Sequence, residues 1–290
     1  MTLRDRVRRI RLYYRSGEIF RESLANPSLA WRLPMLPGAG KVDIRFKSGR
    51  SFSMAARHWP LLPTACRLDR IGAEFEFLDD AKRIRVDGLV LYSPLWERAE
   101  PSYYKEVLLD DAYGVKGRDL SSATVVDVGA FVGDSVLAFA RQGATVHAFE
   151  PSEAYCGFIR RNLDANQLGA KVILHPVGLS EQAGDPATSG DRLHFVEGVD
   201  YTLRNVPRAV DLLKLDCEGA EYHLLSRPEF LEHLSPLEIR MEYHRGEGPI
   251  VDYLGRAGYQ VTLLPPTGRP VGLLTARRAR SAIQTGAGTP

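Results

Sequence analysis

The stretch TVVDVGAFVGDSVLAFARQGATVHAFEP, residues 124–151, decides the fold of this chain. Thr124–Val128 is a short and almost entirely apolar run, which is typical of a strand buried on both faces of a parallel sheet. A turn with two glycines follows, and Ser135–Arg141 is predicted to form a helix that Gly143 ends. Because Thr145–Phe149 reads as the next strand, the stretch predicts a strand-helix-strand unit of a parallel sheet.

The turn after the first strand reads GAFVGD and lacks the G-x-G-x-x-G spacing that brings backbone N–H groups onto a pyrophosphate. Asp127 precedes its first glycine and Asp134 follows its second, so two carboxylates would repel a diphosphate there. A ligand with an ammonium or sulfonium centre suits this turn better, and Glu150, after the second strand, suits a ribose diol. S-adenosylmethionine carries all of these groups. The alternative is a structural turn that binds no ligand.

Strands and helices continue to alternate toward the C-terminus, as expected of an α/β domain. The turn Pro265–Gly268 reverses the chain, so one strand is expected to be antiparallel. We therefore predict an α/β, Rossmann-like sheet of seven strands, mostly parallel with one antiparallel strand. Its later strands are predicted at 171–174, 211–216, 237–243, 259–264 and 271–276.

A second, smaller region is predicted before this domain. Residues 3–15 have an amphipathic helical pattern with many arginines, and residues 41–93 contain short alternating strands separated by turn residues. A bridging helix is predicted near Tyr103–Asp110. The predicted boundaries are 1–118 for the helix, the mainly antiparallel β domain and the bridge, 119–278 for the S-adenosylmethionine-binding domain, and 279–290 for a flexible tail.

The composition of the chain gives little indication of which partners it binds. The formal net charge of the 290 residues is +2, too small to indicate nucleic acid as the main partner. The basic first helix either packs on the protein's own core or meets an anionic partner such as lipid or RNA. The three cysteines, Cys66, Cys156 and Cys217, are far apart and fit neither a disulfide framework nor a zinc site, so no metal and a cytoplasmic location are expected. No run is long enough for a membrane span.

Polar residues at the carboxyl ends of the strands are the first functional candidates, because the ligand of an open α/β sheet lies there. Lys214 and Asp216 share one face of a strand that is predicted to be buried. We interpret Asp216 as facing the cofactor or acceptor, with Lys214 fixing a neighbouring carboxylate; a structural ion pair is the alternative. The next strand ends in Glu242 and His244.

Several segments together are similar to the FkbM family of S-adenosylmethionine-dependent methyltransferases: VVDVGAFVGD at 125–134, AFEP at 148–151, LLKLDCEGAEY at 212–222 and EYH at 242–244. The resemblance covers about residues 110–277. It implies a class I methyltransferase fold and transfer of a methyl group, which in the family's namesake activity goes to an oxygen. The predicted cofactor-binding residues are Asp127, Gly129, Ala130, Gly133, Asp134, Ser135, Glu150, Pro151, Val177 and Asp216, and the predicted substrate-binding residues are Glu218 and Glu221.

His244 is the predicted proton acceptor if the methyl acceptor is a hydroxyl. It is the last polar residue on its face at the end of the strand, and an imidazole titrates near neutral pH. Asp216 or Glu242 would orient the imidazole or the substrate, which completes the predicted catalytic set. A structural cap of the strand is the alternative role of His244.

The predicted function is S-adenosylmethionine-dependent methylation, with a hydroxyl of a small or sugar-containing molecule as the acceptor. One alternative is an RNA-directed methyltransferase or RNA-binding protein that uses the basic first helix, although the near-neutral charge argues against it. A nicotinamide (NAD)-dependent dehydrogenase is a further alternative that would need the missing phosphate-binding turn.

Overall fold

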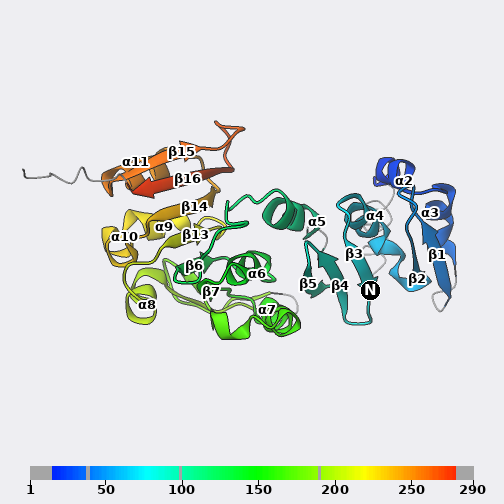
Figure 1. Ribbon diagram of the computed structural model, residues 1–290, viewed down its shortest axis with the longest axis horizontal. Coiled ribbons are helices and arrows are strands. Elements are labelled where there is room, and N and C mark those ends of the chain that lie inside the picture. Colours follow the sequence, from blue (N-terminus) through cyan, green and yellow to red (C-terminus); the bar gives the residue numbers. More distant parts are fainter. Residues whose placement is uncertain (1–14, 37–39, 98–99, 189–190, 279–290) are drawn as a thin grey trace, which may run out of the picture. The chain divides into compact units, whose positions relative to one another are not determined.

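The computed structural model describes residues 15–36, 40–97, 100–188 and 191–278 (Figure 1). The chain divides into two compact units. Unit 1 comprises residues 1–114, 132–138 and 158–167, and unit 2 comprises residues 115–131, 139–157 and 168–290. Most of the basic helix predicted at 3–15 and the whole tail predicted at 279–290 lie outside the described residues.

Unit 2 is built on a seven-stranded sheet with the order β15-β16-β14-β13-β6-β7-β8 (Figure 1). Neighbouring strands from β14 to β8 are parallel, whereas β16 runs antiparallel to both β14 and β15, which confirms the predicted mostly parallel sheet with one antiparallel strand. The strands are β6 (Thr124–Val128), β7 (Thr145–Phe149), β8 (Val172–His175), β13 (Leu212–Leu215), β14 (Glu238–Tyr243), β15 (Tyr259–Leu263) and β16 (Gly272–Arg278).

The centre of this sheet is apolar, as its sequence predicts. Side chains of β6, β13 and β14 that alternate along the strands join one large buried cluster, which includes Val126, Leu213 and Ile239. Burial of this size drives folding. Because β6, β7, β13 and β14 are parallel, their carboxyl ends lie along one edge of the sheet.

Helices connect the strands. They are α6 (Asp134–Arg141), α7 (Glu153–Asn166), α8 (Gly198–Asn205), α9 (Glu221–Ser226), α10 (Pro228–Leu234) and α11 (Gly248–Arg256). At the start of α7, the hydroxyl of Ser152 accepts a hydrogen bond from the Tyr155 backbone N–H at 3.0 Å and so caps the helix. The connection from β8 to β13 also contains the short strands β9 (Gly178–Ser180), β10 (Ala187–Thr188), β11 (Asp191–Arg192) and β12 (Phe195–Glu197).

Unit 1 contains two small antiparallel sheets, which confirms a mainly β region near the N-terminus. The first pairs β1 (Lys41–Arg45) with β2 (Ser51–Ala55), and the second contains β3 (Glu74–Phe77), β4 (Ala81–Val86) and β5 (Leu89–Pro94). Phe46, Phe52, Phe75 and Phe77 pack against one another in the core of this unit.

Short helices surround these sheets: α2 (Gly17–Ser23), α3 (Ser28–Arg32), η1 (Leu33–Met35), η2 (Ala56–Leu61) and α4 (Leu62–Arg70). The predicted bridging helix is present as α5 (Glu100–Tyr104) continued by η3 (Lys105–Leu109). Within the same unit, the Asn162 amide of α7 bonds both the backbone N–H and the C=O of Tyr92 in β5, which covers part of that strand's edge. Among the described residues, no helix has the length and apolar character that crossing a bilayer requires.

Candidate functional site

The turn after β6 lies unusually close to the end of β13. Gly129 has a φ of +87°, and a Cβ atom added there would lie 1.7 Å from the backbone carbonyl oxygen of Asp216. Only glycine fits this position, because the backbone conformation is left-handed and the space is already occupied. The N–H groups of Gly129 and Ala130 both donate to the carbonyl of Phe149, at 3.0 and 2.9 Å. These two donors are therefore used inside the protein, which agrees with a turn that does not bind a pyrophosphate.

Asp127 is buried beside a lysine of the neighbouring strand. Its Oδ1 lies 2.9 Å from Nζ of Lys214, and the side chains are 0% and 2% exposed. Lys214 also donates to the backbone carbonyl of Gly129 at 2.5 Å. The structure thus pairs Lys214 with Asp127 and with the turn, and both are too deeply buried to meet a ligand. Asp127 was predicted to bind the cofactor directly, but its position instead supports the shape of the turn.

Glu150 follows β7 and holds the other side of the turn. Its Oε2 accepts the Phe131 N–H at 2.8 Å, and its Oε1 accepts the Ser152 N–H at 2.9 Å. Burial raises the pKa of Glu150 to about 7, although the two backbone hydrogen bonds act in the opposite direction. Phe131 has a φ of +50°, a strained conformation for a bulky residue. Since a carboxylate has about four acceptor positions, Glu150 can still accept hydrogen bonds from a ligand.

The remaining predicted cofactor residues lie in different surroundings. Ala130 is fully buried, and Val177 is part of the apolar core of unit 2. The side chain of Pro151 lies where a Cβ on Gly178 would touch it, at 2.9 Å. Gly133, Asp134 and Ser135 belong to the residues grouped with unit 1, where the two polar side chains are buried at the start of α6.

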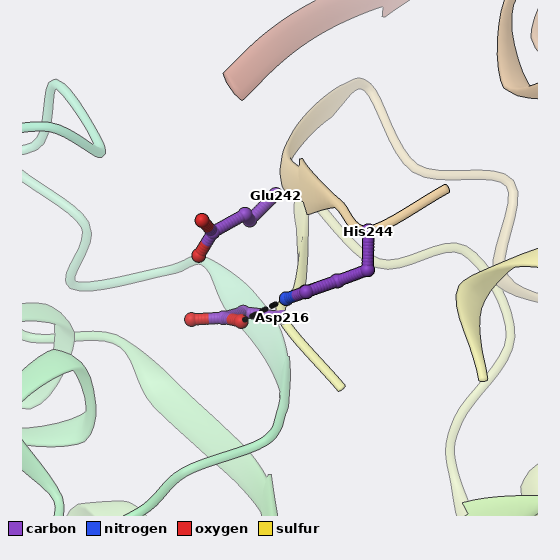
Figure 2. Close-up of side chains that lie close together, drawn as sticks. All are labelled: Asp216, Glu242 and His244. Atoms are coloured by element: carbon purple, nitrogen blue, oxygen red, sulfur yellow. Dashed lines mark ion pairs between the residues drawn. The ribbon is translucent and has the colours of Figure 1, made fainter. Parts of the chain in front are cut away.

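The three predicted catalytic residues come together at the ends of β13 and β14. Figure 2 shows Asp216, Glu242 and His244 with their polar atoms converging, and the dashed line joins His244 to Asp216. Nε2 of His244 lies 3.8 Å from Oδ1 of Asp216. One ligand-type atom from each residue lies within 4.8 Å of the other two, a spacing that could also hold a cation. We call these three residues the strand-end cluster.

The two predicted substrate-binding residues differ sharply from each other. The side chain of Glu218 is 90% exposed, and its Oε2 lies 3.7 Å from Nε2 of His244. The side chain of Glu221 is 0% exposed, so direct contact with a substrate is ruled out by burial. Instead, Oε1 of Glu221 lies 3.0 Å from Nδ1 of His244. The expectation for Glu221 is therefore corrected: it contacts a member of the strand-end cluster from behind.

These carboxylates control the charge of His244. The hydrogen bond with Glu221 raises the pKa of His244, burial lowers it, and the nearby charges of Glu221, Asp216 and Glu218 raise it further, with a net rise. Burial raises the pKa of Glu221, but its hydrogen bond with His244 and other contacts outweigh burial, and the net pKa is lowered. The imidazole thus favours a proton, and the buried carboxylate favours its negative charge.

The sequence analysis expected Lys214 to fix a neighbouring carboxylate, and the structure identifies that carboxylate as Asp127. The pairing of Glu221 with His244 was not predicted. The signal for Lys214 was a lysine inside an apolar strand, which requires a buried counter-charge. The only sequence signal for Glu221 was its place as an acidic residue in the first turn of a helix. The helix dipole explains an acidic residue at that place equally well.

The sheet order, the single antiparallel strand and a glycine turn that meets the end of β13 define the class of protein: this is a class I methyltransferase fold. Residues 127–261 match the family model of the methyltransferase FkbM domain. This part of the chain is therefore similar to the FkbM methyltransferase domain.

Solved structures of methyltransferases resemble the chain at low sequence identity. One is precorrin-6y C5,15-methyltransferase from Geobacter metallireducens, at 19% identity and a TM-score of 0.41, with 60% of this chain and 89% of that chain covered. Another is methyltransferase FkbM from Methylobacillus flagellatus, at 16% identity and a TM-score of 0.44, with 76% and 54% covered. TYW2 of M. jannaschii in complex with AdoMet shares 14% identity with a TM-score of 0.43, with 71% and 90% covered. No curated protein sequence matches the chain.

Proposed function

We propose that the protein transfers a methyl group from S-adenosylmethionine to a hydroxyl oxygen of a small or sugar-containing molecule. The observation that carries the proposal is the contact between Gly129 and Asp216, because it joins the turn to the strand-end cluster. A cofactor that lies on the turn is then next to Asp216, Glu242 and His244. The absence of a side chain at Gly129 is what allows the turn to approach the Asp216 carbonyl this closely.

The residues present fit S-adenosylmethionine. The carboxylate of Glu150 has the acceptor positions that a ribose diol requires, and the carboxylate of Asp216, 31% exposed, suits the cationic part of the ligand. When bound, S-adenosylmethionine supplies a methyl group that is already activated by a positive sulfur. The protein's residues therefore need mainly to position the acceptor oxygen and exclude water.

In the proposed reaction His244 takes the proton of the acceptor hydroxyl through Nε2. An O–CH₃ bond forms as the S–CH₃ bond breaks, and the products are S-adenosylhomocysteine, the methyl ether and one proton on the imidazole. Asp216 stabilises the positive charge that the imidazole gains. Glu242 lies on the same strand face as His244 and is proposed to bind the acceptor.

The charge of the strand-end cluster bears on the class of acceptor. Three carboxylates, on Asp216, Glu218 and Glu242, lie near one histidine. A polyanion such as RNA would be repelled at this place, whereas hydroxyl groups donate hydrogen bonds to carboxylates. A neutral molecule rich in hydroxyls therefore fits better than RNA.

Isothermal titration calorimetry with the full chain tests the proposal. S-adenosylmethionine and S-adenosylhomocysteine should bind, and NAD should not. Removing the carboxylate in Glu150→Ala should weaken S-adenosylmethionine binding by roughly 1–3 kcal/mol, because hydrogen-bonding groups lose their partner. The matched control is Glu153→Ala, which removes an exposed carboxylate from the first turn of α7. Binding of NAD with no binding of S-adenosylmethionine would refute the proposal.

A further inference from the structure

The carboxylate of Glu221 is surrounded by hydrogen-bond donors. Its Oε2 accepts the backbone N–H of Gly219 at 2.8 Å, and its Oε1 accepts the backbone N–H of His244 at 3.1 Å. The thiol of Cys217 lies 3.5 Å from Oε2. Glu221 therefore ties the turn after β13 to the end of β14, and a fully buried carboxylate with such partners is held in one position.

These contacts decide which nitrogen of His244 carries its proton. An ionised carboxylate can only accept hydrogen bonds, and Oε1 of Glu221 lies 3.0 Å from Nδ1 of His244. A favourable contact at that distance requires a proton on Nδ1. In the neutral imidazole the lone pair is then on Nε2, the atom on the side of Asp216 and Glu218.

The surroundings of Nε2 differ from those of Nδ1. The nearest carboxylate oxygens, on Asp216 and Glu218, lie 3.8 and 3.7 Å from Nε2, too far for a good hydrogen bond. Asp216 and Glu218 follow β13, Glu221 begins α9, and Glu242 lies on β14, so each element around the imidazole contributes a negative charge. Nδ1 is fixed inside the protein, and Nε2 faces the cluster where the acceptor is proposed to bind.

We propose that Glu221 is a positioning residue for His244, whose buried carboxylate fixes the proton on Nδ1 and turns the lone pair of Nε2 toward the acceptor hydroxyl. This inference rests on the proposed methyl transfer, since it assigns the partner that prepares the proton acceptor. The buried carboxylate holds the imidazole in the tautomer that a proton acceptor at Nε2 requires.

Nuclear magnetic resonance of ¹⁵N-labelled histidines tests this without an acceptor or a cofactor. In the wild-type protein at high pH, His244 should carry its proton on Nδ1. In Glu221→Gln the pKa of His244 should fall, because the charged partner is lost. The matched control is Glu197→Gln, which changes a second glutamate–histidine pair, with Oε1 3.1 Å from Nε2 of His223. That control should leave the tautomer and the pKa of His244 unchanged.

Methyl transfer gives the second readout, with labelled S-adenosylmethionine and the small molecules of a cell extract as acceptors. Glu221→Gln should lower kcat by roughly 10²-fold with S-adenosylmethionine affinity unchanged. Glu197→Gln should change neither. The positioning role and the methyltransferase activity can fail separately, because the tautomer is measured without turnover.

Three results would overturn the inference: a proton on Nε2 of neutral His244 in the wild-type protein, a pKa of His244 that does not move in Glu221→Gln, or a stoichiometric divalent ion bound at Nε2 in the purified protein. The first and third need no variant. They decide the matter even if Glu221→Gln does not fold.

Discussion

At the scale of single residues, the buried charges of unit 2 explain how the turn keeps its shape. Asp127 and Lys214 are register partners on adjacent strands, and the lysine also donates to the carbonyl of Gly129. An ion pair removed from water in this way is sensitive to the loss of one partner, because the other charge is then buried without compensation.

We expect Lys214→Met to lower the free energy of unfolding by roughly 3–5 kcal/mol, since Asp127 would remain buried without its cation. The double variant Lys214→Met, Asp127→Leu should be more stable than Lys214→Met alone, because no buried charge is left. Urea denaturation of the single and double variants measures both. A double variant that loses as much stability as the sum of two single variants would show that the pair is not coupled.

Glu150 should make cofactor binding depend on pH. Its pKa is raised to about 7 by burial, so in the free protein part of the population is protonated near neutral pH. Ribose hydroxyls favour the carboxylate, and binding therefore releases this proton. Affinity for S-adenosylmethionine should rise by up to about tenfold per pH unit below about pH 7 and level off above it. Calorimetry from about pH 6 to about pH 8 measures this, and Glu150→Gln should remove the dependence; an unchanged dependence in that variant would contradict it.

At the scale of elements, periodicity and turn residues were enough to predict the strands of the large sheet. The apolar run of β6 and the Pro265–Gly268 turn predicted a mostly parallel sheet with a late antiparallel strand, as observed. The helix α8 was missed because its sequence GVDYTLRN has weak helical propensity. It forms because Glu197 caps it through the Asp200 N–H and because Val199 and Thr202 are buried.

Only part of the site could be predicted from the sequence. The sequence placed Asp216, Glu242 and His244 at the ends of adjacent strands, and the structure brings them together. The sequence could not show which side chains pair between different strands and helices, because such pairs depend on strand register and on the packing of the helices. Lys214 meets Asp127 and Glu221 meets His244 only through the tertiary structure.

The glycine turn yields a prediction at this scale. In Gly129→Ala the new methyl group would lie 1.7 Å from the Asp216 carbonyl oxygen, and the backbone would stay at a φ of +87°. We expect loss of S-adenosylmethionine binding and a marked fall in melting temperature. The control is Gly157→Ala in α7, where a Cβ meets nothing within 4 Å. Alanine in a helix should stabilise by roughly 0.5–1 kcal/mol there. Normal binding by Gly129→Ala would contradict the assigned role of the turn.

At the scale of the whole molecule, stability should depend on a pair of buried histidines in the sheet. Nδ1 of His147 lies 3.1 Å from Nε2 of His175, and the His175 ring stacks on Phe149 with centroids 4.4 Å apart. Burial, with a smaller effect of His147, lowers the pKa of His175 from 6.5 to about 4. The folded protein therefore binds this proton less readily than the unfolded chain does.

The resulting stabilisation is present above about pH 6.5 and is lost as the pH falls toward about 4. Between about pH 7 and about pH 5 the free energy of unfolding should fall by about 2 kcal/mol from His175 alone. Urea denaturation at the two pH values measures the change. His175→Gln keeps a polar side chain but does not titrate, so it should lose less stability over this range. Equal losses in both proteins would show that His175 is not the group responsible.

The most direct test of the account is a crystal structure of the full chain with S-adenosylhomocysteine. We expect the ribose hydroxyls to bond the carboxylate of Glu150, the ligand to cross Gly129, and its sulfur to face Asp216 and His244. A ligand bound elsewhere, or one whose sulfur points away from the strand-end cluster, would contradict the account.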